Sequence, residues 1–246
     1  MYGRDYQGRT INFEASGGLV HASLIMQDQE TDTYWSIMEG KAVAGELKGS
    51  ELVELPYGEK MQWRHWKKKH PDTLVLSVDG REDASQSYAW YYGSPEGFNY
   101  VRATDDRLET KEPVFAFHRN DIAYATRQKD LENGQSFELE DGASIFLYRK
   151  QGGSKFQSTL AFVSENGFEQ RDGEWIEKGS GAGFDPATGD FADASAERLG
   201  GFDTFWYTWS LSNPETRVLE LELATEPRRK PEQHGGTKGA KLTPRT

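Results

Sequence analysis

The sequence predicts a mainly β fold (β-rich α+β) of two similar half-domains from an internal duplication, with short helices that carry tryptophan. Short runs of β-branched and aromatic residues, separated by Gly, Asp or Asn, dominate the 246 residues and are typical of strands. Only two short segments space their apolar residues as a helix does. A tryptophan motif also occurs twice, which indicates the duplication.

The duplication is the strongest pattern in the chain, because six of the seven tryptophans fall in paired positions. Two tryptophans three residues apart precede a proline in both copies: Trp63, Trp66 and Pro71, and Trp206, Trp209 and Pro214. Upstream of each copy lies a tryptophan followed by glycines: Trp35 with Gly40 and Gly45, and Trp175 with Gly179, Gly181 and Gly183. We interpret these residues as a structural repeat motif. Two copies predict two half-domains, since a solenoid usually needs three or more repeats.

Four regions follow from the duplication. We expect a first repeat over 1–78, an aromatic-rich connector packed on the body over 79–112, a second repeat over 113–225 and a disordered basic tail over 226–246. The tail holds six Lys or Arg but a single large aliphatic residue, too few to form a core. Counted back from the second copy, part of the first repeat would precede Met1. We therefore expect the first repeat to be N-terminally incomplete.

Strand-like segments occur in both repeats and are bounded by turn residues. We predict strands near 10–15, 19–27, 33–38, 73–78, 114–118, 121–126, 143–149, 157–164 and 217–224. Pairs such as Gly17-Gly18, Asp79-Gly80 and Asp141-Gly142 favour turns, and the last of them predicts a hairpin.

Two short helices are predicted, each with tryptophans on one face. They cover residues 59–69 and 204–212, where two tryptophans lie at i and i+3. Asp203 is a favourable N-cap for the second helix, and a proline stops each helix two residues after its end. Because a short helix is stable only when it buries a face, we expect the paired tryptophans to lie in the core.

Composition excludes several classes of function. Residues 1–225 carry 23 Lys or Arg and 38 Asp or Glu, and this acidic body would repel a phosphate backbone, so no nucleic-acid partner is expected. No apolar run approaches the roughly 20 residues of a membrane span. Met1 is not followed by a signal-peptide pattern. The absence of cysteine excludes thiol chemistry from these residues.

Carboxylates and a histidine form a candidate metal site. Asp28, Glu30 and Asp32 alternate, so on a strand they would share one face, and carboxylate oxygens suit hard cations. His70 follows the first predicted helix, five residues after His65. We take Asp28, Asp32 and His70 as candidate metal ligands. The alternatives are a solvated acidic loop and a histidine that interacts with the C-terminus of the helix.

Aromatic side chains of the connector form a candidate ligand-binding surface. Trp90, Tyr91 and Tyr92 lie outside the repeat, and sugars stack on such rings. His21 and His118 are each in a predicted strand and could be a ligand or general base, although a hydrogen-bonded strand histidine is the simpler interpretation. No G-x-S-x-G motif occurs, so no catalytic residue is assigned.

The motifs resemble those of a known family. They are Leu24-Ile-Met-Gln-Asp28, Thr33-Tyr-Trp35, Gly40-Lys-Ala42-Val-Ala-Gly45, Trp63-x-x-Trp66 and His70-Pro71-Asp72-Thr73-Leu-Val-Leu76. This pattern resembles the bacterial and archaeal family called "domain of unknown function 3179", over roughly residues 8–225. The resemblance implies a mostly extracytoplasmic protein with no assigned activity. Members typically carry an export signal or lipoprotein anchor and a Cys-Pro-Leu-Cys motif shortly before the position of Tyr2. This chain shows neither, which agrees with an incomplete first repeat.

Three functions stay open on the sequence alone. The favoured one is an extracytoplasmic, non-catalytic binding or structural protein, in the periplasm or at the cell surface as the resemblance implies. The second is a metal or redox protein whose Cys-x-x-Cys lies in a missing N-terminal segment. The third is a carbohydrate-binding module that uses the connector aromatics. No cofactor, partner or oligomeric state is identified, and enzymatic activity is not predicted.

Overall fold

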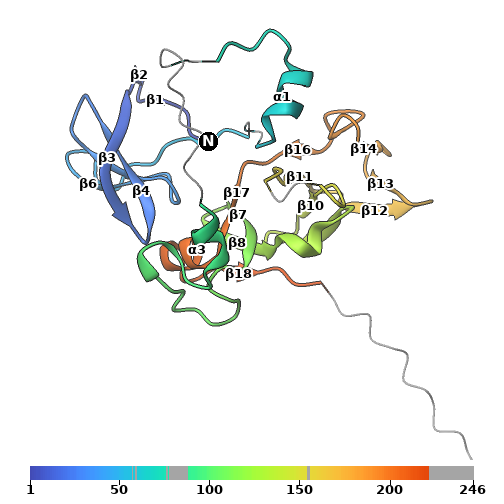
Figure 1. Cartoon of the computed structure of the whole chain (residues 1–246). Helices are drawn as coiled ribbons and strands as arrows, with labels where there is room; N and C mark the ends of the chain where they lie inside the picture. The colour runs from blue at the N-terminus through green and yellow to red at the C-terminus, as the bar shows by residue number, and fades with distance from the viewer. Residues whose placement is uncertain (57, 59, 76, 78–87, 154–155, 222–246) are drawn as a thin grey trace, which may run out of the picture.

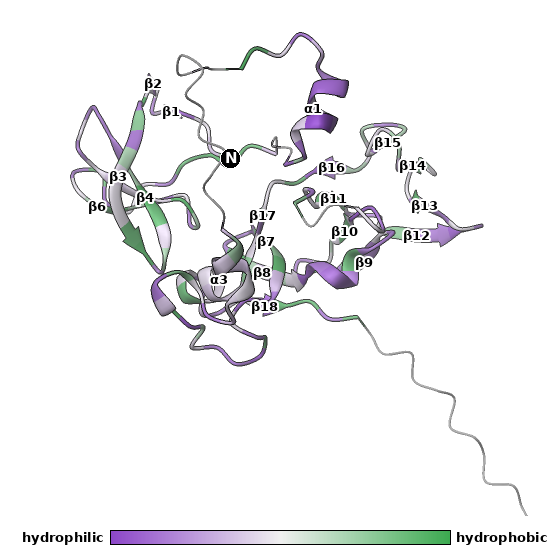
Figure 2. Ribbon diagram, viewed as in Figure 1, coloured by the Kyte–Doolittle hydropathy of each residue, from purple (hydrophilic) through white to green (hydrophobic). Residues whose placement is uncertain are grey.

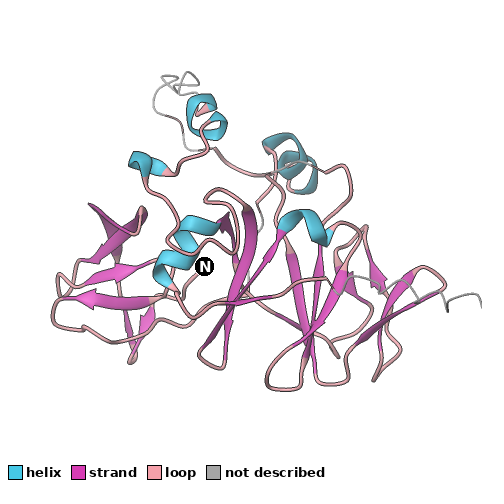
Figure 3. Cartoon of the chain, turned by 90° about the horizontal axis from the view of Figure 1, so that it is seen from below, coloured by secondary structure: helices cyan, strands magenta, loops and turns pink. Residues whose placement is uncertain are grey.

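The computed structural model describes the chain in six stretches: residues 1–56, 58, 60–75, 77, 88–153 and 156–221. It is mainly β with a few short helices, as predicted. Figure 3 shows the sheets side by side along the molecule, with the helices gathered on one side of them. Within the described residues, no helix combines the length and the apolar character that a membrane span requires. The predicted tail lies outside the described residues.

The first sheet belongs to the N-terminal part of the chain (Figure 1). Its antiparallel strands run in the order β3 (Phe13–Val20), β4 (Ser23–Asp28), β5 (Tyr34–Ser36) and β6 (Lys41–Ala44), after a small hairpin of β1 (Asp5–Tyr6) and β2 (Arg9–Thr10). Trp35 of β5 is 1% exposed and packs with Ile11 and Ala42. The rings of Tyr6 and Phe13 meet it edge-on. Trp35 is therefore the centre of a small core.

Two further sheets form the larger part of the molecule. The central sheet has the order β17 (Phe202–Phe205), β7 (Pro113–Arg119), β8 (Ile122–Arg127) and β18 (Arg217–Val218), and only β18 is parallel to its neighbour. The outer sheet has the order β16 (Glu197–Arg198), β11 (Leu160–Ser164), β10 (Ser144–Tyr148) and β9 (Gln135–Glu138), all antiparallel.

Alternate residues of these strands make the main core, because successive side chains point to opposite faces of a strand. Phe115 and Phe117 of β7 pack in one cluster with Ile145 and Leu147 of β10 and Val163 of β11. All five are at most 5% exposed. The central and outer sheets therefore pack face to face.

Separate elements cover the outward faces of these two sheets. Helix α3 (Trp206–Ser212) covers the central sheet, where Trp206 and Trp209 pack on Val114 and Ala116. Two hairpins cover the outer sheet: β12 (Phe168–Arg171) with β13 (Glu174–Glu177), and β14 (Phe184–Asp185) with β15 (Asp190–Phe191). Their phenylalanines surround Phe146 of β10. The resulting layers place the end of α3 beside the β7–β8 turn.

The remaining helices are short and more exposed. They are α1 (Trp63–Lys69), α2 (Ala89–Gly93), η1 (Phe98–Tyr100) and η2 (Gln128–Leu131). Helix α1 has no buried residue, and Trp63 is 50% exposed. Figure 2 shows this helix coloured mainly hydrophilic. The expectation that all paired tryptophans lie in the core is therefore wrong for Trp63 and for the half-buried Trp66, because α1 is not packed on a sheet as α3 is.

Strand predictions were most accurate where the apolar runs are longest. The predicted segments 114–118, 121–126, 143–149 and 157–164 all contain observed strands. The described part of 73–78 forms no strand, and Leu74 is 94% exposed. Asp203 is not an N-cap: it lies in β17 and pairs with Arg149, and Phe205 precedes the helix. The strand β17 continues to Phe205, so the helix begins too late for Asp203 to be its N-cap.

Candidate functional site: a cleft between the first sheet and the end of α3

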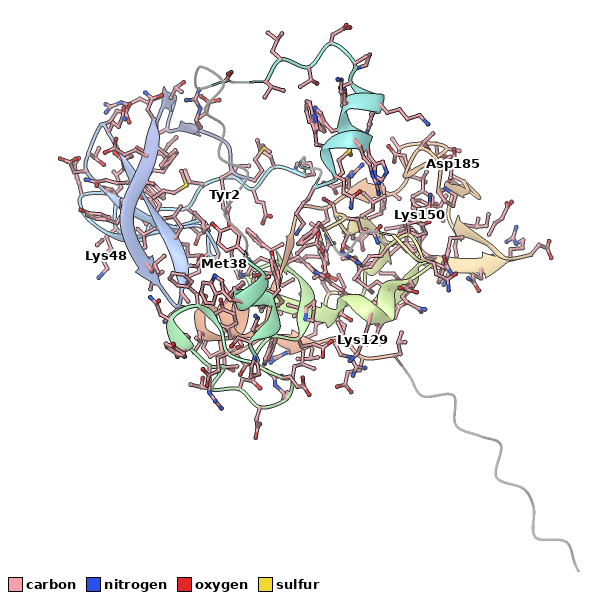
Figure 4. All side chains as sticks on the ribbon, in the orientation of Figure 1. Tyr2, Met38, Lys48, Lys129, Lys150 and Asp185 are labelled. Atoms are coloured by element: carbon pink, nitrogen blue, oxygen red, sulfur yellow. The ribbon has the colours of Figure 1, made fainter. Side chains whose placement is uncertain are left out.

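A polar cleft of about 650 Å³ opens where the first sheet meets the central sheet. Its walls come from the chain start, the β5–β6 region, the β7–β8 turn and the segment after α3. They comprise Tyr2, Glu39, Lys41, Glu51, Leu52, Glu54, His118, Asp121, Ile122, Ala123, Ser212, Asn213, Pro214, Glu215 and Arg217. Figure 4 shows Tyr2 between the first sheet and β7. We name this space the inter-sheet cleft.

Tyr2 is held in the cleft wall by a close approach to Gly40. The Tyr2 hydroxyl donates a hydrogen bond to the carbonyl of Ile37 at 3.2 Å. Gly40 has a φ of +66°, and a Cβ at this position would lie 2.5 Å from the Tyr2 ring. Only glycine fits both constraints without a shift of the ring. Gly40 of the repeat motif therefore has a structural reason to be glycine.

His118 points into the cleft from β7 because of strand alternation. It shares a face with Val114 and Ala116, the face that α3 covers. Its ring centroid lies 4.8 Å from that of Trp209. His118 Nε2 lies 2.8 Å from Asn213 Oδ1, the residue that ends α3, and donates to it. Packing and this hydrogen bond fix the orientation of the imidazole.

A second histidine joins the first sheet to the end of α3. His21 and Ala22 form the two-residue turn between β3 and β4, with φ values of +48° and +58°. Such a turn is usually made by Asn-Gly, so this pair carries backbone strain. His21 Nδ1 lies 3.2 Å from Ser212 Oγ. The strained turn thus presents a side chain that docks the hairpin on α3.

Carboxylates outnumber cations in the cleft, with five Asp or Glu against one Lys and one Arg. Lys41 pairs with Glu51 at 2.8 Å, and Arg217 pairs with Glu140, which is outside the cleft. Within the described residues, four cleft carboxylates form no ion pair: Glu39, Glu54, Asp121 and Glu215. A concave surface lined by one sign of charge concentrates the opposite charge, so the cleft attracts cations.

Glu54 is the most unusual of these carboxylates. Its Oε1 atom is buried and has no hydrogen-bond partner within the described residues. Burial raises the pKa of Glu54. Burial and the nearby carboxylates of Glu54 and Glu39 also raise the pKa of Tyr2. A buried acceptor without a donor is costly, and a ligand that brings an N–H group would satisfy it.

Comparison with known proteins identifies the family of the chain. The sequence model of the family described as "Protein of unknown function (DUF3179)" matches residues 1–216. The chain belongs to the DUF3179 family. No curated protein and no solved structure matches the chain. This membership confirms the family resemblance of the sequence motifs. The family has no assigned function, so we infer the function from the site.

In this DUF3179 protein the carboxylates predicted as metal ligands lie at the end of β4 and in the segment that follows it. Asp28 ends β4 and is 0% exposed. Although burial opposes it, hydrogen bonds from the indole of Trp35 and from Thr31 lower the pKa of Asp28. Asp32 lies beyond the strand, with a φ of +54°. The expectation that these carboxylates share a strand face is therefore wrong, because β4 ends at Asp28.

His70, the third predicted ligand, lies elsewhere. It ends α1 and stacks on Trp66, with ring centroids 4.3 Å apart. Figure 1 shows α1 well apart from β4. Within the described residues, no group of three or more His, Asp or Glu is arranged to hold a metal ion. Metal binding stays a prediction.

The connector aromatics are brought together on α2. Trp90 is 65% exposed and Tyr92 is 45% exposed. The hydroxyl of Tyr91 lies 2.9 Å from that of Tyr207, and the ammonium of Lys111 lies 3.9 Å from the centre of the Tyr91 ring. Tyr91 therefore connects α2 to α3, whereas Trp90 and Tyr92 keep exposed ring surface, Tyr92 while packing on Phe156. Ligand binding there stays a prediction.

The other residues of the repeat motif are placed in different environments. Trp66 donates its indole N–H to the hydroxyl of Thr73, Trp206 donates to the carbonyl of Asp105 and Trp175 donates to the carbonyl of Asn133. Gly45 has a φ of +104° and lies against Thr33. Pro71 follows α1 outside any helix or strand, and Pro214 follows α3 and lines the inter-sheet cleft.

Sequence reasoning missed most of the cleft. Of the residues that the sequence singled out, His118 and Pro214 are among its described lining residues, and Pro214 was assigned only to the structural repeat motif. Tyr2, Glu54 and Asp121 are far apart in the sequence and share no motif. The one local signal was Asn120-Asp121, a favourable pair for the two-residue turn that it forms between β7 and β8.

Proposed function

We propose that this DUF3179 protein is a non-catalytic binding protein whose inter-sheet cleft takes a small, positively charged organic ligand with an amine or guanidinium group. The observation that carries the proposal is that Glu54, which lines this cleft, has a buried Oε1 without a hydrogen-bond partner within the described residues. A donor from a cationic ligand would form a charge-assisted hydrogen bond there, which is stronger than a neutral one. The excess of carboxylates supports the same sign of ligand.

The size of the cleft supports a small molecule. Its volume of about 650 Å³ lies within the range of roughly 300–1,000 Å³ that is usual for ligand pockets. Tyr2, Ile122 and Pro214 supply apolar surface beside the carboxylates. A compact amine with a short hydrocarbon part matches both kinds of wall.

The histidines at the cleft support binding. Within the described residues, the imidazole of His118 is hydrogen-bonded to Asn213 and to no hydroxyl, so it has no adjacent nucleophile to activate. His21, which is not among the cleft's lining residues, bonds to Ser212, but within the described residues no third group orients its imidazole as a serine mechanism requires. We therefore assign no reaction to this cleft.

The test is a thermal-shift and calorimetric panel of putrescine, agmatine, tetramethylammonium and Ca²⁺. At about 100 times Kd a ligand stabilises the folded state by ~2.7 kcal/mol, and we expect a rise in Tm of several degrees with an organic cation. A rise in Tm with Ca²⁺ alone would mean that the cleft binds a metal ion and not an organic cation.

Paired variants locate the effect. Glu54→Gln with Asp121→Asn removes two cleft carboxylates, and Asp172→Asn with Glu174→Gln removes two exposed carboxylates of the β12–β13 hairpin. The first pair should abolish the rise in Tm and the second should leave it unchanged. Absence of binding by the whole panel, or equal loss in both variants, would refute the proposal.

Carbohydrate binding is a second candidate, supported by the exposure of Trp90 and Tyr92 on α2. Two exposed rings on one short helix can stack on sugar faces. A glycan panel read by tryptophan fluorescence tests it, with Trp90→Ala as the variant and Trp63→Ala, the other half-exposed tryptophan, as the control. No change in fluorescence with any glycan would exclude it.

We also propose that the protein acts outside the cytoplasm, at the cell surface or in the periplasm, as the resemblance to this family implies. Fractionation of cells that produce the native protein tests this, and recovery in the cytoplasmic fraction would contradict it.

Internal duplication is a further part of the proposal. Helices α1 and α3 both have seven residues, and they end at His70 and Asn213 with closely similar backbone angles (φ −129°, ψ 76° and φ −131°, ψ 72°). In both, the N–H of the residue after the helix bonds to the carbonyl of the second tryptophan. These likenesses support a common origin of the two segments. Superposition of 62–73 on 205–216 in an experimental structure tests it, and different helix ends would count against it.

A further inference from the structure

A second cleft, of about 760 Å³, lies between α1 and the outer sheet. Its lining residues come from α1, from strands β10, β11 and β16, and from the turn between β14 and β15: Lys60, Met61, His65, Lys68, Lys69, Tyr148, Lys150, Gln157, Ser158, Leu160, Pro186, Ala187, Thr188, Gly189 and Arg198. Figure 4 labels Lys150 below α1, away from Tyr2 and the inter-sheet cleft. We name this space the basic cleft.

The charge of the basic cleft is opposite to that of the whole chain. Among the described residues, four Lys, one Arg and one His line it, and no Asp or Glu does. The chain as a whole has a net charge of −11. A random surface of such a protein would carry more carboxylates than cations, so this local excess of positive charge needs a cause.

Four of these cations are not neutralised by a partner within the described residues. Within the described residues, Lys60, Lys68, Lys150 and Arg198 form no ion pair. The guanidinium of Arg198 lies over the ring of Phe162 at 5.6 Å, which fixes the side chain but leaves its charge uncompensated. Clustered like charges repel each other, and a bound anion would remove that repulsion.

The helix dipole explains only part of the cluster. Lysines in the last turn of α1 interact favourably with the negative end of the helix. Lys150 follows β10 and Arg198 lies in β16, so the dipole of α1 does not account for either of them. Lys60 is placed by a backbone bond, in which Ser158 N–H donates to its carbonyl at 3.0 Å. Three separate segments therefore bring cations to one space.

The remaining walls are mainly apolar. Met61, Tyr148, Leu160 and Pro186 line the cleft, and Tyr148 is 9% exposed. The hydroxyl groups of Ser158 and Thr188 also line the cleft, where they donate to the carbonyls of Lys60 and Asp185. A ligand in this space would meet cations at its charged end and hydrocarbon along its body.

We propose that the basic cleft binds a small anion that carries a phosphate or sulfate group on an apolar body. Arginine and lysine recognise such groups through charge-assisted hydrogen bonds, and the apolar wall would take the attached ring or chain. The acidic surface elsewhere disfavours a long polyanion, which would have to cross it. The ligand is therefore compact.

Isothermal titration calorimetry with four probes tests the proposal. Phenyl phosphate and phenyl sulfate carry both features, inorganic phosphate carries only the charge, and benzyl alcohol carries only the ring. We expect the two phenyl esters to bind, inorganic phosphate to bind about tenfold more weakly and benzyl alcohol not to bind. The ester with the higher affinity distinguishes phosphate from sulfate. Binding should weaken as salt is raised, because salt screens exposed charges.

Matched charge variants decide where the anion binds. Lys68→Gln, Lys150→Gln and Arg198→Gln together remove three charges from the basic cleft, and binding of phenyl phosphate should fall by about tenfold or more. Lys48→Gln, Lys129→Gln and Arg171→Gln remove three exposed charges elsewhere, and binding should change less than about twofold. Figure 4 labels Lys48 and Lys129 at a distance from Lys150.

Three results would overturn the proposal. They are no binding of either phenyl ester at low salt, equal losses in the two triple variants, and benzyl alcohol binding as tightly as phenyl phosphate. If the Arg198 change disturbs the fold, Lys68→Gln with Lys150→Gln repeats the test, because both side chains are exposed.

Discussion

At the scale of single residues, two glutamates show how environment decides what a carboxylate does. Glu177 is 0% exposed and accepts hydrogen bonds from the Ser164 hydroxyl at 2.5 Å and the Ser180 N–H at 2.7 Å. In the part of the chain that the structure describes, a buried oxygen of Glu54 has no such donor. Glu177 therefore stabilises the fold, whereas we propose that Glu54 accepts a hydrogen bond from a ligand.

Glu177→Gln should destabilise the protein at neutral pH and weaken its loss of stability in acid. Although burial opposes it, hydrogen bonds from Ser164 and Ser180 lower the pKa of Glu177 to about 2. The stability from this shift, about 3 kcal/mol, is present above the ordinary pKa and is lost as pH falls towards 2. Urea unfolding at pH 7, 4 and 2.5 measures it. The exposed Glu174→Gln is the control, and equal pH slopes in native protein and Glu177→Gln would contradict the assignment.

Glu54→Gln should have the opposite effect on the free protein. Burial raises the pKa of Glu54, so ionisation above that pKa costs folding stability. The cost is absent below the ordinary pKa and appears as pH rises through the folded pKa. The neutral glutamine removes it, and Tm at pH 7 without ligand should rise. A fall in Tm would mean that the Glu54 carboxylate is already satisfied.

Gly45→Ala should destabilise the protein more than Gly49→Ala. Both glycines have a positive φ, +104° and +88°, so both substitutions carry strain of about 1–2 kcal/mol. At Gly45 the added Cβ would also lie 2.7 Å from the Thr33 Cα, whereas at Gly49 it would meet open space. Urea midpoints compare the two, and equal losses would show that the turn can move.

At the scale of elements, the sequence predicted what depends on local periodicity. The apolar runs in β7, β8, β10 and β11 are long enough to identify buried strands. The hairpins β12–β15 were missed because their strands have two to four residues and are partly polar. The inter-sheet cleft was beyond prediction, since it is formed by loops that only the packing of separate elements brings together.

The tryptophan helices allow an element-scale prediction. Trp209 of α3 is 0% exposed and packs on the central sheet, with its ring against His118 of β7, whereas Trp63 of α1 is 50% exposed. Trp209→Ala should cost about 3–5 kcal/mol in free energy of unfolding, and Trp63→Ala less than about 1 kcal/mol. Urea unfolding measures both. A large cost at Trp63 would mean that α1 packs on a surface that these contacts do not include.

At the scale of the whole molecule, the sheets separate two clefts of opposite charge. The inter-sheet cleft holds His118 among carboxylates, and the basic cleft holds His65 among lysines and Arg198. The two clefts therefore select small ligands of opposite charge, because each cleft attracts ligands of one charge and repels those of the other. The NMR signal of His118 is therefore sensitive to a ligand in the inter-sheet cleft, and that of His65 to a ligand in the basic cleft.

The proposed cation site is tested most directly by NMR. The imidazole signals of His118, His65 and His70 are followed at fixed pH while the best-binding amine of the panel is added. We predict a saturable shift of the His118 signal and no shift of the His65 and His70 signals. The shift of His118 should be lost in Glu54→Gln. An unmoved His118 signal, or equal shifts of all three, would contradict a cation site in the inter-sheet cleft.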